Sequence, residues 1–414
     1  MNIFLKIFTH LKKYGIQSFK IYLFYNLKIL LKKPVVFVKT YIRVNRLKKP
    51  DKLLGVYSFD IKYENINILK DRFEFTNNIY FENKYSLKNY KNYDGKVNSK
   101  VLVFSSIFIG NSEKNIENDF TINTMSSAEN AGWIVNQYYG KSQQNSSQAI
   151  KEKELAEFID ILEKFKPQLL CIDSNSPINY NYFNYERLFN LKKKYNFKVL
   201  MLVPDFELRK LQYWGGDLVD LVLFSRPSLR RKISFIPKHK LICLPGIPYS
   251  ESTFKAANEK KYDVYYSGSD TRQRRIFLDS ASSTSLKVKA MFENRMNHKS
   301  PDYESYKRYI GEARMTFANG YVSKNNSLIA GRFIESILSR CVCLYEDCLD
   351  LNSFFIPYLH YVPVSNVHEF VTTAQYLRIN PEILSRISEE ANTFYIENYS
   401  SKLFWNYIAL RMNS

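Results

Sequence analysis

Two polar stretches of the sequence have residue types and spacings that could bind a ligand. In the first, the small residues Ser267, Gly268 and Ser269 stand between an apolar run and a basic run. Backbone N–H groups in such a turn, together with the N-terminus of a following helix, stabilise a phosphate. The basic run adds the guanidinium groups of Arg272, Arg274 and Arg275. Each guanidinium can donate two parallel hydrogen bonds to the oxygens of a phosphate. We predict a phosphate site here; the alternative is a solvated helix face.

The second stretch, residues 331–338, places a carboxylate inside an otherwise apolar helical segment. Arg332 and Glu335 are three residues apart and therefore share one helix face, whereas the other face is apolar. A carboxylate on such a face can accept two hydrogen bonds from a ligand. The alternative is a local surface ion pair between Arg332 and Glu335.

The elements that must position these residues show two kinds of apolar pattern, short continuous runs typical of strands and a spacing typical of amphipathic helices. Runs of strand length are Val101–Phe104, Leu169–Ile172, Val199–Val203, Leu221–Phe224, Tyr262–Tyr266, Met315–Ala318 and Val342–Tyr345, with a further candidate at Leu54–Ser58. Helical spacing appears around Ala128–Trp133 and in Glu154–Phe165, Tyr185–Tyr195, 367–379, 381–396 and Ser401–Met412. Short strands that alternate with amphipathic helices predict parallel sheets with helices on both faces.

The length of 414 residues favours two domains, because one hydrophobic core of that size is unusual. A segment rich in Pro, Gly and charge separates two series of strand and helix patterns. We predict an α/β protein with two Rossmann-like domains facing across a cleft and a basic helical extension at the N-terminus. The predicted parts are a basic extension (1–50), a first Rossmann-like domain (51–250), a linker (251–261), a second Rossmann-like domain (262–396) and a closing helix (397–414).

The positive charge is concentrated in one segment. Of a formal net charge of +20, residues 1–50 contribute twelve Lys and Arg residues and no acid. This uneven distribution argues against a nucleic-acid-binding surface over the whole protein. Lysines interrupt every apolar run of the segment, so we do not expect it to span a bilayer. Cations mixed with Phe, Tyr and Leu favour contact with an anionic membrane surface through residues 1–48, and a helical hairpin packed on the protein is the alternative.

Composition and cysteine usage indicate a folded protein with reduced thiols. Apolar residues make up 45% and charged residues 24% of the chain, which excludes extensive disorder and a polytopic membrane protein. The odd number of cysteines predicts free thiols and a cytosolic setting. Because the cysteines form no CxxC pair, and no suitable acidic metal motif is present, we expect neither a metal nor another cofactor.

Residues 260–400 resemble, in order and spacing, the C-terminal donor-binding half of GT-B fold glycosyltransferases. The resemblance lies in Tyr262–Ser269 with the arginines that follow, Gly331–Leu338, Val342–Tyr345, Phe354–Phe355, Tyr361–Pro363 and Glu369–Phe370. It implies a nucleotide-sugar donor whose ribose hydroxyls bind Glu335 and whose diphosphate meets Arg332 or Lys324. The donor loop would include Asn326 and Ser327. Ser327 stands where many retaining members of the superfamily place a second glutamate, eight residues before Glu335.

A base for the acceptor hydroxyl is needed only if the transfer inverts the sugar's configuration. Such a base is usually a carboxylate or histidine at the end of a first-domain strand. The acids at suitable positions are Asp60, Glu113, Asp173 and Asp205, of which Asp173 and Asp205 are our candidates. Capping of a helix is the alternative role for each.

The sequence therefore predicts a cytoplasmic glycosyltransferase, peripheral on the inner membrane face, that transfers a sugar to a surface glycan or lipid-linked acceptor. The alternatives are a polyol-phosphate transferase or sugar epimerase on the same scaffold, which would use histidine or paired acids in the cleft, and a non-catalytic nucleotide- or polyanion-binding protein.

Overall fold

The computed structural model divides into two compact units, residues 1–62 and 63–414. The structure describes residue 73 and the ranges 83–93, 99–106, 119–140, 147–173, 185–203, 217–230, 233–293, 301–323, 326–327, 329–346, 348 and 350–413, all in the second unit. The basic segment 1–50, the strand expected at Leu54–Ser58, and Asp60, Glu113, Asp205 and Lys324 lie outside these residues.

The first sheet contains six parallel strands in the order β2-β1-β3-β4-β5-β6. Their bounds are β1 Lys100–Ser106, β2 Ile134–Gly140, β3 Leu169–Asp173, β4 Lys198–Val203, β5 Leu221–Phe224 and β6 Leu241–Cys243. Strand β2 was not predicted, because this edge strand carries Asn136 and Gln137 and lacks a continuous apolar run. The strand order reverses between β1 and β3, which creates the kind of switch point where open α/β sheets bind ligands.

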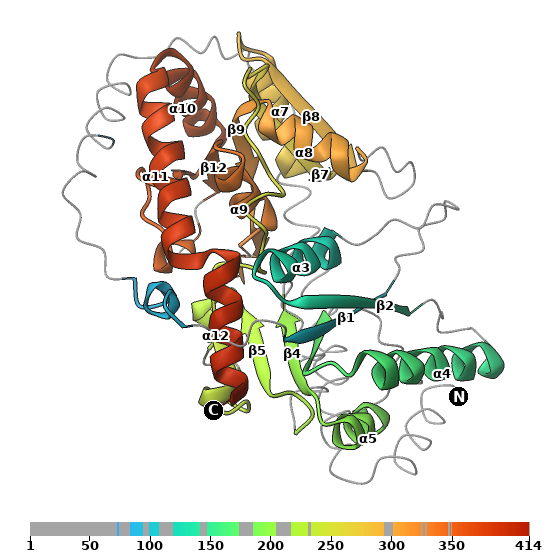
Figure 1. Ribbon diagram of the computed structural model, residues 1–414. Coiled ribbons are helices and arrows are strands. Elements are labelled where there is room, and N and C mark those ends of the chain that lie inside the picture. Colours follow the sequence, from blue (N-terminus) through green and yellow to red (C-terminus); the bar gives the residue numbers. More distant parts are fainter. Residues whose placement is uncertain are drawn as a thin grey trace, which may run out of the picture. The chain divides into compact units, whose positions relative to one another are not determined.

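Successive residues of the central strands enter two different cores. Val101 and Val103 of β1 belong to one hydrophobic cluster, and Leu102 and Phe104 belong to another. Helices α3 Asp119–Asn130 and α12 Ser401–Asn413 contribute to the first cluster, and α4 Gln148–Phe165 and α5 Tyr185–Tyr195 contribute to the second. The sheet is thus covered on both faces, as the near-continuous apolar strands predicted (Figure 1).

The second sheet contains five parallel strands in the order β13-β12-β9-β7-β8. Their bounds are β7 Tyr262–Ser269, β8 Val288–Glu293, β9 Ala313–Ala318, β12 Val342–Glu346 and β13 Val362–Val364. A short antiparallel pair, β10 Tyr321–Ser323 and β11 Asn326–Ser327, follows β9. The switch point of this sheet lies between β7 and β9.

Helices cover both faces of the second sheet as well. Residues of α7 Arg272–Ser282 and α10 Val367–Ile379 pack on one face, and residues of α8 Tyr303–Gly311, α9 Gly331–Leu338 and α11 Pro381–Tyr399 pack on the other. The described residues also form short 3-10 helices, namely η3 Lys88–Tyr90, η4 Pro227–Leu229, η5 Lys238–Lys240 and η6 Leu351–Ser353. The prediction of two Rossmann-like sheets with helices on both faces is confirmed.

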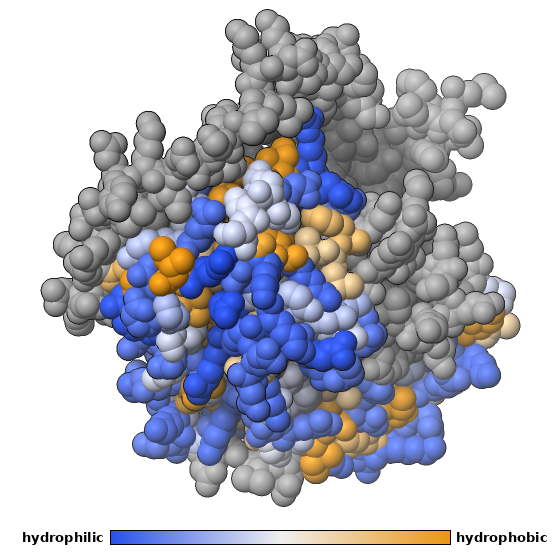
Figure 2. Space-filling model, turned by 90° about the horizontal axis from the view of Figure 1, so that it is seen from above, coloured by the Kyte–Doolittle hydropathy of each residue, from blue (hydrophilic) through white to orange (hydrophobic). Residues whose placement is uncertain are grey.

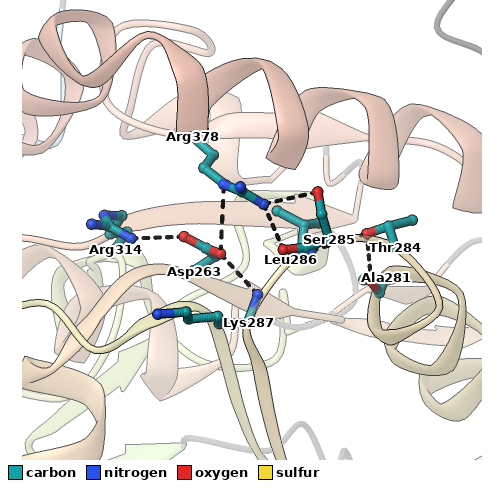
Figure 3. A network of polar contacts seen from close by, with 8 residues as sticks. All are labelled: Asp263, Ala281, Thr284, Ser285, Leu286, Lys287, Arg314 and Arg378. Carbon is teal, nitrogen blue, oxygen red and sulfur yellow. Dashed lines mark hydrogen bonds and ion pairs between the residues drawn. The ribbon is translucent and has the colours of Figure 1, made fainter.

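Polar contacts close the amino-terminal edge of the second sheet (Figure 3). The buried Asp263 at the start of β7 accepts hydrogen bonds of 2.8 Å from the backbone N–H of Lys287 and from Nη1 of Arg314. Arg378 reaches the same carboxylate from α10 and donates to the Ser285 carbonyl. The groups at this edge are satisfied by internal partners, which leaves the carboxyl ends of the strands as the candidate ligand-binding edge.

The C-terminal helix returns to the first sheet. Trp405 on α12 donates a 3.0 Å hydrogen bond from its indole Nε1 to the Ser127 hydroxyl on α3. Residues 244–261, which contain the predicted linker, form only turns, bends and irregular backbone between β6 and β7. One hydrophobic cluster includes residues of both sheets, so the linker and α12 join the two Rossmann-like parts in a common core.

The described surface carries apolar side chains in small, separate groups on a mostly hydrophilic face (Figure 2). The exposed large apolar residues are Ile134, Ile150, Phe235, Ile276, Ile379 and Ile396. Single exposed apolar residues of this kind are ordinary on a folded protein. Among the described residues, no helix combines the length and hydropathy that crossing a bilayer requires.

Candidate functional site

Ser267, Gly268 and Ser269 form the end of strand β7 and not the turn that we predicted. They pair in register with Met291, Phe292 and Glu293 of β8, because the strand pairing continues past the apolar run. The turn itself consists of Asp270 and Thr271, and the Thr271 side chain caps helix α7 by accepting from the Arg274 backbone N–H. The small residues therefore lie at the carboxyl end of a strand beside the switch point.

Arg332, in the first turn of α9, lies across this switch point. Its guanidinium packs 4.6 Å from the ring centroid of Tyr266 on β7, and its Nη1 donates a 3.4 Å hydrogen bond to the Phe317 carbonyl of β9. Its Nε is buried and has no hydrogen-bond partner among the described residues. Burial opposes its charge, but Tyr306, Tyr266 and Glu335 outweigh this and raise the pKa of Arg332. The arginine is thus a permanent, partly unsatisfied cation.

The three arginines of α7 have different environments. Arg274 donates to the Ser269 carbonyl at 3.1 Å and to the Asn319 carbonyl at 3.4 Å, and so joins the ends of β7 and β9. Arg275 forms a surface ion pair with Asp270, whose pKa that hydrogen bond lowers. Arg272 is exposed at the start of the helix. Of the three, Arg274 is the one that shares the switch point with Arg332.

Glu335 is buried, with 8% of its surface exposed, and both of its carboxylate oxygens accept hydrogen bonds from tyrosines. The Tyr249 hydroxyl donates to Oε1 at 3.1 Å, and the Tyr306 hydroxyl donates to Oε2. Burial raises the pKa of Glu335, whereas the Tyr306 hydrogen bond, the Arg332 charge and the Tyr249 hydrogen bond act in the opposite direction. No ion pair joins Arg332 to Glu335 in the part of the chain that the structure describes, so the local surface pair is not formed.

The sequence analysis missed the aromatic partners of the site, which are Tyr249, Tyr266 and Tyr306. A signal existed for Tyr306, because Tyr303, Tyr306 and Tyr309 recur at the three-residue spacing of one helix face. No such signal existed for Tyr249, which lies in the irregular segment after β6. Tyr266 gave no signal either, because nothing in the sequence distinguishes it from the other residues of its apolar strand.

Several predicted site residues cannot be compared with this geometry. Asp173 is the last residue of β3, at the switch point of the first sheet, but its side chain lies outside the described atoms. The same holds for the side chains of Asn326 and Ser327 on β11, and Asp205 and Lys324 lie outside the described residues. The roles of these residues stay predictions.

The buried histidine of the second domain, His360, is not suited to act as a catalytic base. Burial lowers the pKa of His360 to about 3. Its Nδ1 accepts a hydrogen bond from the Ile356 backbone, and its ring stacks on Phe394. Within the described residues, no group of three or more His, Cys, Asp or Glu side chains could hold a metal ion. The five cysteines form no disulfide with one another.

A scan against protein-family models and a search of the curated proteins found no match to this chain. Solved structures do share its architecture. The HepE protein of Anabaena, crystallised with UDP and glucose, superposes with a TM-score of 0.51 at 8% identity over 76% of this chain and 99% of its own. The fold is that of the GT-B glycosyltransferases. A glycosyltransferase from Rickettsia africae has the same TM-score of 0.51 at 10% identity, over 77% of this chain and 100% of its own.

In GT-B terms, the first sheet belongs to the N-terminal domain and the second sheet to the C-terminal domain. The GT-B resemblance inferred from residues 260–400 is therefore confirmed at the level of the fold. The candidate site of the C-terminal domain lies where β7 and β9 end. It contains Gly268 and Ser269 of β7, Arg274 of α7 and Arg332 of α9.

Proposed function

We propose that this protein is a glycosyltransferase that takes a sugar from a nucleotide-sugar donor. The observation that carries the proposal is the meeting of Arg274 and Arg332 at the switch point of the second sheet. Two cations at the carboxyl ends of parallel strands are suited to the charge of a diphosphate. The Anabaena GT-B structure holds UDP and glucose, which supports a donor of this class.

Arg332 is the residue that we assign to the diphosphate first. Its guanidinium is already held by the Tyr266 ring and the Phe317 carbonyl, so little side-chain entropy would be lost on binding. Its buried Nε has no partner among the described residues, and a phosphate oxygen would supply one. Arg274 would add a second forked donor from α7.

Glu335 is assigned to the ribose of the donor. A carboxylate can accept both hydroxyls of a vicinal diol, and charge-assisted hydrogen bonds of this kind contribute more than neutral ones. Arg332 and Glu335 lie on consecutive turns of α9, so one helix would contact both the diphosphate and the ribose. This arrangement gives a reason for a carboxylate inside an apolar helix.

The acceptor and the location of the enzyme are proposed from composition. We assign a surface glycan or lipid-linked acceptor and a peripheral position on the inner membrane face, because residues 1–50 carry twelve cations and no acid. If the reaction inverts the sugar, Asp173 and Asp205 are the proposed bases.

A donor screen tests the proposal. Thermal shifts are measured with UDP-, GDP-, CMP- and ADP-sugars, since a ligand at 100 times its Kd stabilises a protein by about 2.7 kcal/mol. Release of the free nucleotide in the presence of membrane-lipid acceptors then measures transfer, because an epimerase releases none. Binding without release for every donor would favour the non-catalytic alternative. If the Arg332→Gln variant binds the donor as tightly as the wild type does, the proposed diphosphate site is wrong.

A further inference from the structure

The two tyrosines that bind Glu335 come from different parts of the fold. Tyr249 belongs to the irregular segment after β6, and Tyr306 lies on α8. Their hydroxyls donate to different carboxylate oxygens, Tyr249 to Oε1 and Tyr306 to Oε2. Both carboxylate oxygens of Glu335 therefore already accept a hydrogen bond from an O–H donor.

Tyr249 is the more deeply buried partner of the two. It is 2% exposed, and its ring packs edge-on against Phe254. A Cβ on Gly331 would lie 2.5 Å from the Tyr249 hydroxyl, so the absence of a side chain at the first residue of α9 makes room for that hydroxyl. The Tyr249 hydroxyl therefore lies directly against the first residue of α9.

Tyr306 is less enclosed. Its residue is only partly buried, and its ring contacts Phe254 and Tyr265 at centroid distances of 6.2 and 6.1 Å. Of the two hydroxyl donors, Tyr306 is therefore the one whose residue keeps part of its surface exposed.

We propose that Tyr306 is a positioning residue that occupies the ribose position on Glu335 until the donor arrives, while Tyr249 holds the other oxygen in both states. The inference rests on the proposed function, since the ribose belongs to the proposed donor. A phenol O–H and a ribose O–H are both hydrogen-bond donors, so a ribose hydroxyl can take the place of the Tyr306 hydroxyl on Oε2. Without such a placeholder, the empty site would hold a buried carboxylate oxygen with no donor, which costs free energy.

The test compares Tyr306→Phe with Tyr249→Phe by titration calorimetry, using UDP, GDP, ADP and CDP and their 2′-deoxy counterparts. Tyr306→Phe removes a competitor worth one net hydrogen bond, so it should bind the ribonucleotide about two- to tenfold more tightly. Its preference for the ribo over the deoxy form should also increase. Tyr249→Phe should bring no such gain in affinity, because the hydrogen bond that it removes is present both before and after the donor binds.

Tyr303→Phe is the matched control, because Tyr303 lies one turn earlier on α8 and donates to Asn123 at 2.7 Å instead of Glu335. Its ribo preference should equal that of the wild type. A purely structural role for Tyr306 predicts unchanged or weaker binding in Tyr306→Phe, and that result would overturn the inference. If Tyr306→Phe does not fold, replacement of Tyr306 by 4-fluorophenylalanine keeps the ring shape and serves the same comparison.

The outcomes also separate this inference from the proposed function. A wild type that binds none of the four diphosphates contradicts both. A wild type that prefers the ribo form, together with a Tyr306→Phe variant of equal or lower affinity, contradicts the placeholder role alone and leaves the donor site standing.

Discussion

The Nη2 atom of Arg332 lies 2.9 Å from the position that a Cβ would take on Gly268. A side chain at residue 268 would meet this guanidinium, so the glycine leaves the space in which Arg332 crosses the end of β7. Gly268 also has a φ of +149°, a backbone conformation that favours glycine. Gly268 is thus the position at which strand β7 leaves space for a side chain of helix α9.

Gly268→Ala should reduce both stability and nucleotide affinity. The positive φ alone predicts a loss of about 1 to 3 kcal/mol in the free energy of unfolding, and the new methyl group would displace Arg332. Gly132→Ala is the control, because Gly132 has a φ of +83° but no atom within 4 Å of its would-be Cβ. Urea unfolding and UDP titration should show a stability loss in both variants and an affinity loss only in Gly268→Ala. Equal UDP affinities would place the diphosphate elsewhere.

Arg274→Gln and Arg275→Gln should differ in their effect on nucleotide binding. Arg274 lies at the switch point, and loss of a charge-assisted hydrogen bond worth about 1.5 to 3 kcal/mol predicts a 10- to 150-fold rise in the Kd of a nucleoside diphosphate. Arg275 is paired with Asp270 at the surface, so its removal should change that Kd by less than about threefold. The Kd of the nucleoside without phosphates should stay the same in both variants. A larger effect for Arg275 would reverse our assignment.

Glu335→Gln should change the pH dependence of stability. The pKa of Glu335 is raised in the folded protein above its ordinary value of 4.5, so the folded state binds the proton more tightly than the unfolded state. The free energy of unfolding therefore contains a term that is fully present below pH 4.5 and is lost as pH rises through the raised pKa. Glutamine lacks this term but can still hydrogen-bond with both tyrosines.

The measurement is the Tm of the wild type and of Glu335→Gln from pH 4 to pH 8. The Tm of the variant minus that of the wild type should increase with pH over this range. A difference that decreases with pH would mean that the folded protein stabilises the charged carboxylate. Above the raised pKa, where the wild type carries a charged carboxylate, the variant should also lose discrimination between UDP and 2′-deoxy-UDP, since its neutral amide binds the ribose less strongly.

Replacement of Asp350 should lower the free energy of unfolding far more than replacement of a surface acid. It accepts hydrogen bonds of 2.8 and 2.7 Å from the backbone and hydroxyl of Ser228, and its Oδ2 lies 3.5 Å from Nε of the buried Arg226. Asp350→Ala would leave that arginine buried without its carboxylate, which predicts a loss of about 3 to 5 kcal/mol. Asp160→Ala breaks an exposed pair with Lys164 and should cost less than about 1 kcal/mol. Urea unfolding compares them, and similar losses would contradict the burial argument.

Deletion of residues 1–48 tests the proposed membrane contact. The truncated protein should bind nucleoside diphosphates normally but sediment less with anionic vesicles, because each Lys or Arg near such a surface contributes about 1 kcal/mol. Neutral vesicles are the control and should bind both proteins weakly. Equal sedimentation of the two proteins with anionic vesicles would exclude the anchor, and an insoluble truncation would support the packed hairpin.

The sequence by itself determined many strands and helices of the fold and the residue types of the candidate site. Apolar runs such as Val199–Val203 became buried strands, and the spacing in Glu154–Phe165 lies within helix α4, because period and burial are local properties of the chain. The alternation of these elements led to two parallel sheets. The motif around Arg332 and Glu335 led to the GT-B resemblance, which the comparison of structures confirms as a fold.

Only the tertiary structure decided which groups these residues touch. Strand pairing with β8 moved Ser267–Ser269 out of the predicted turn, and the edge position of β2 allowed a strand without an apolar run. Glu335 meets Tyr249, 86 residues earlier in the chain, and Tyr306, 29 residues earlier. Spacing along a sequence reports neighbours within one element, whereas these contacts depend on how separate elements pack. The carboxylate was therefore visible in the sequence, and its two tyrosine partners were not.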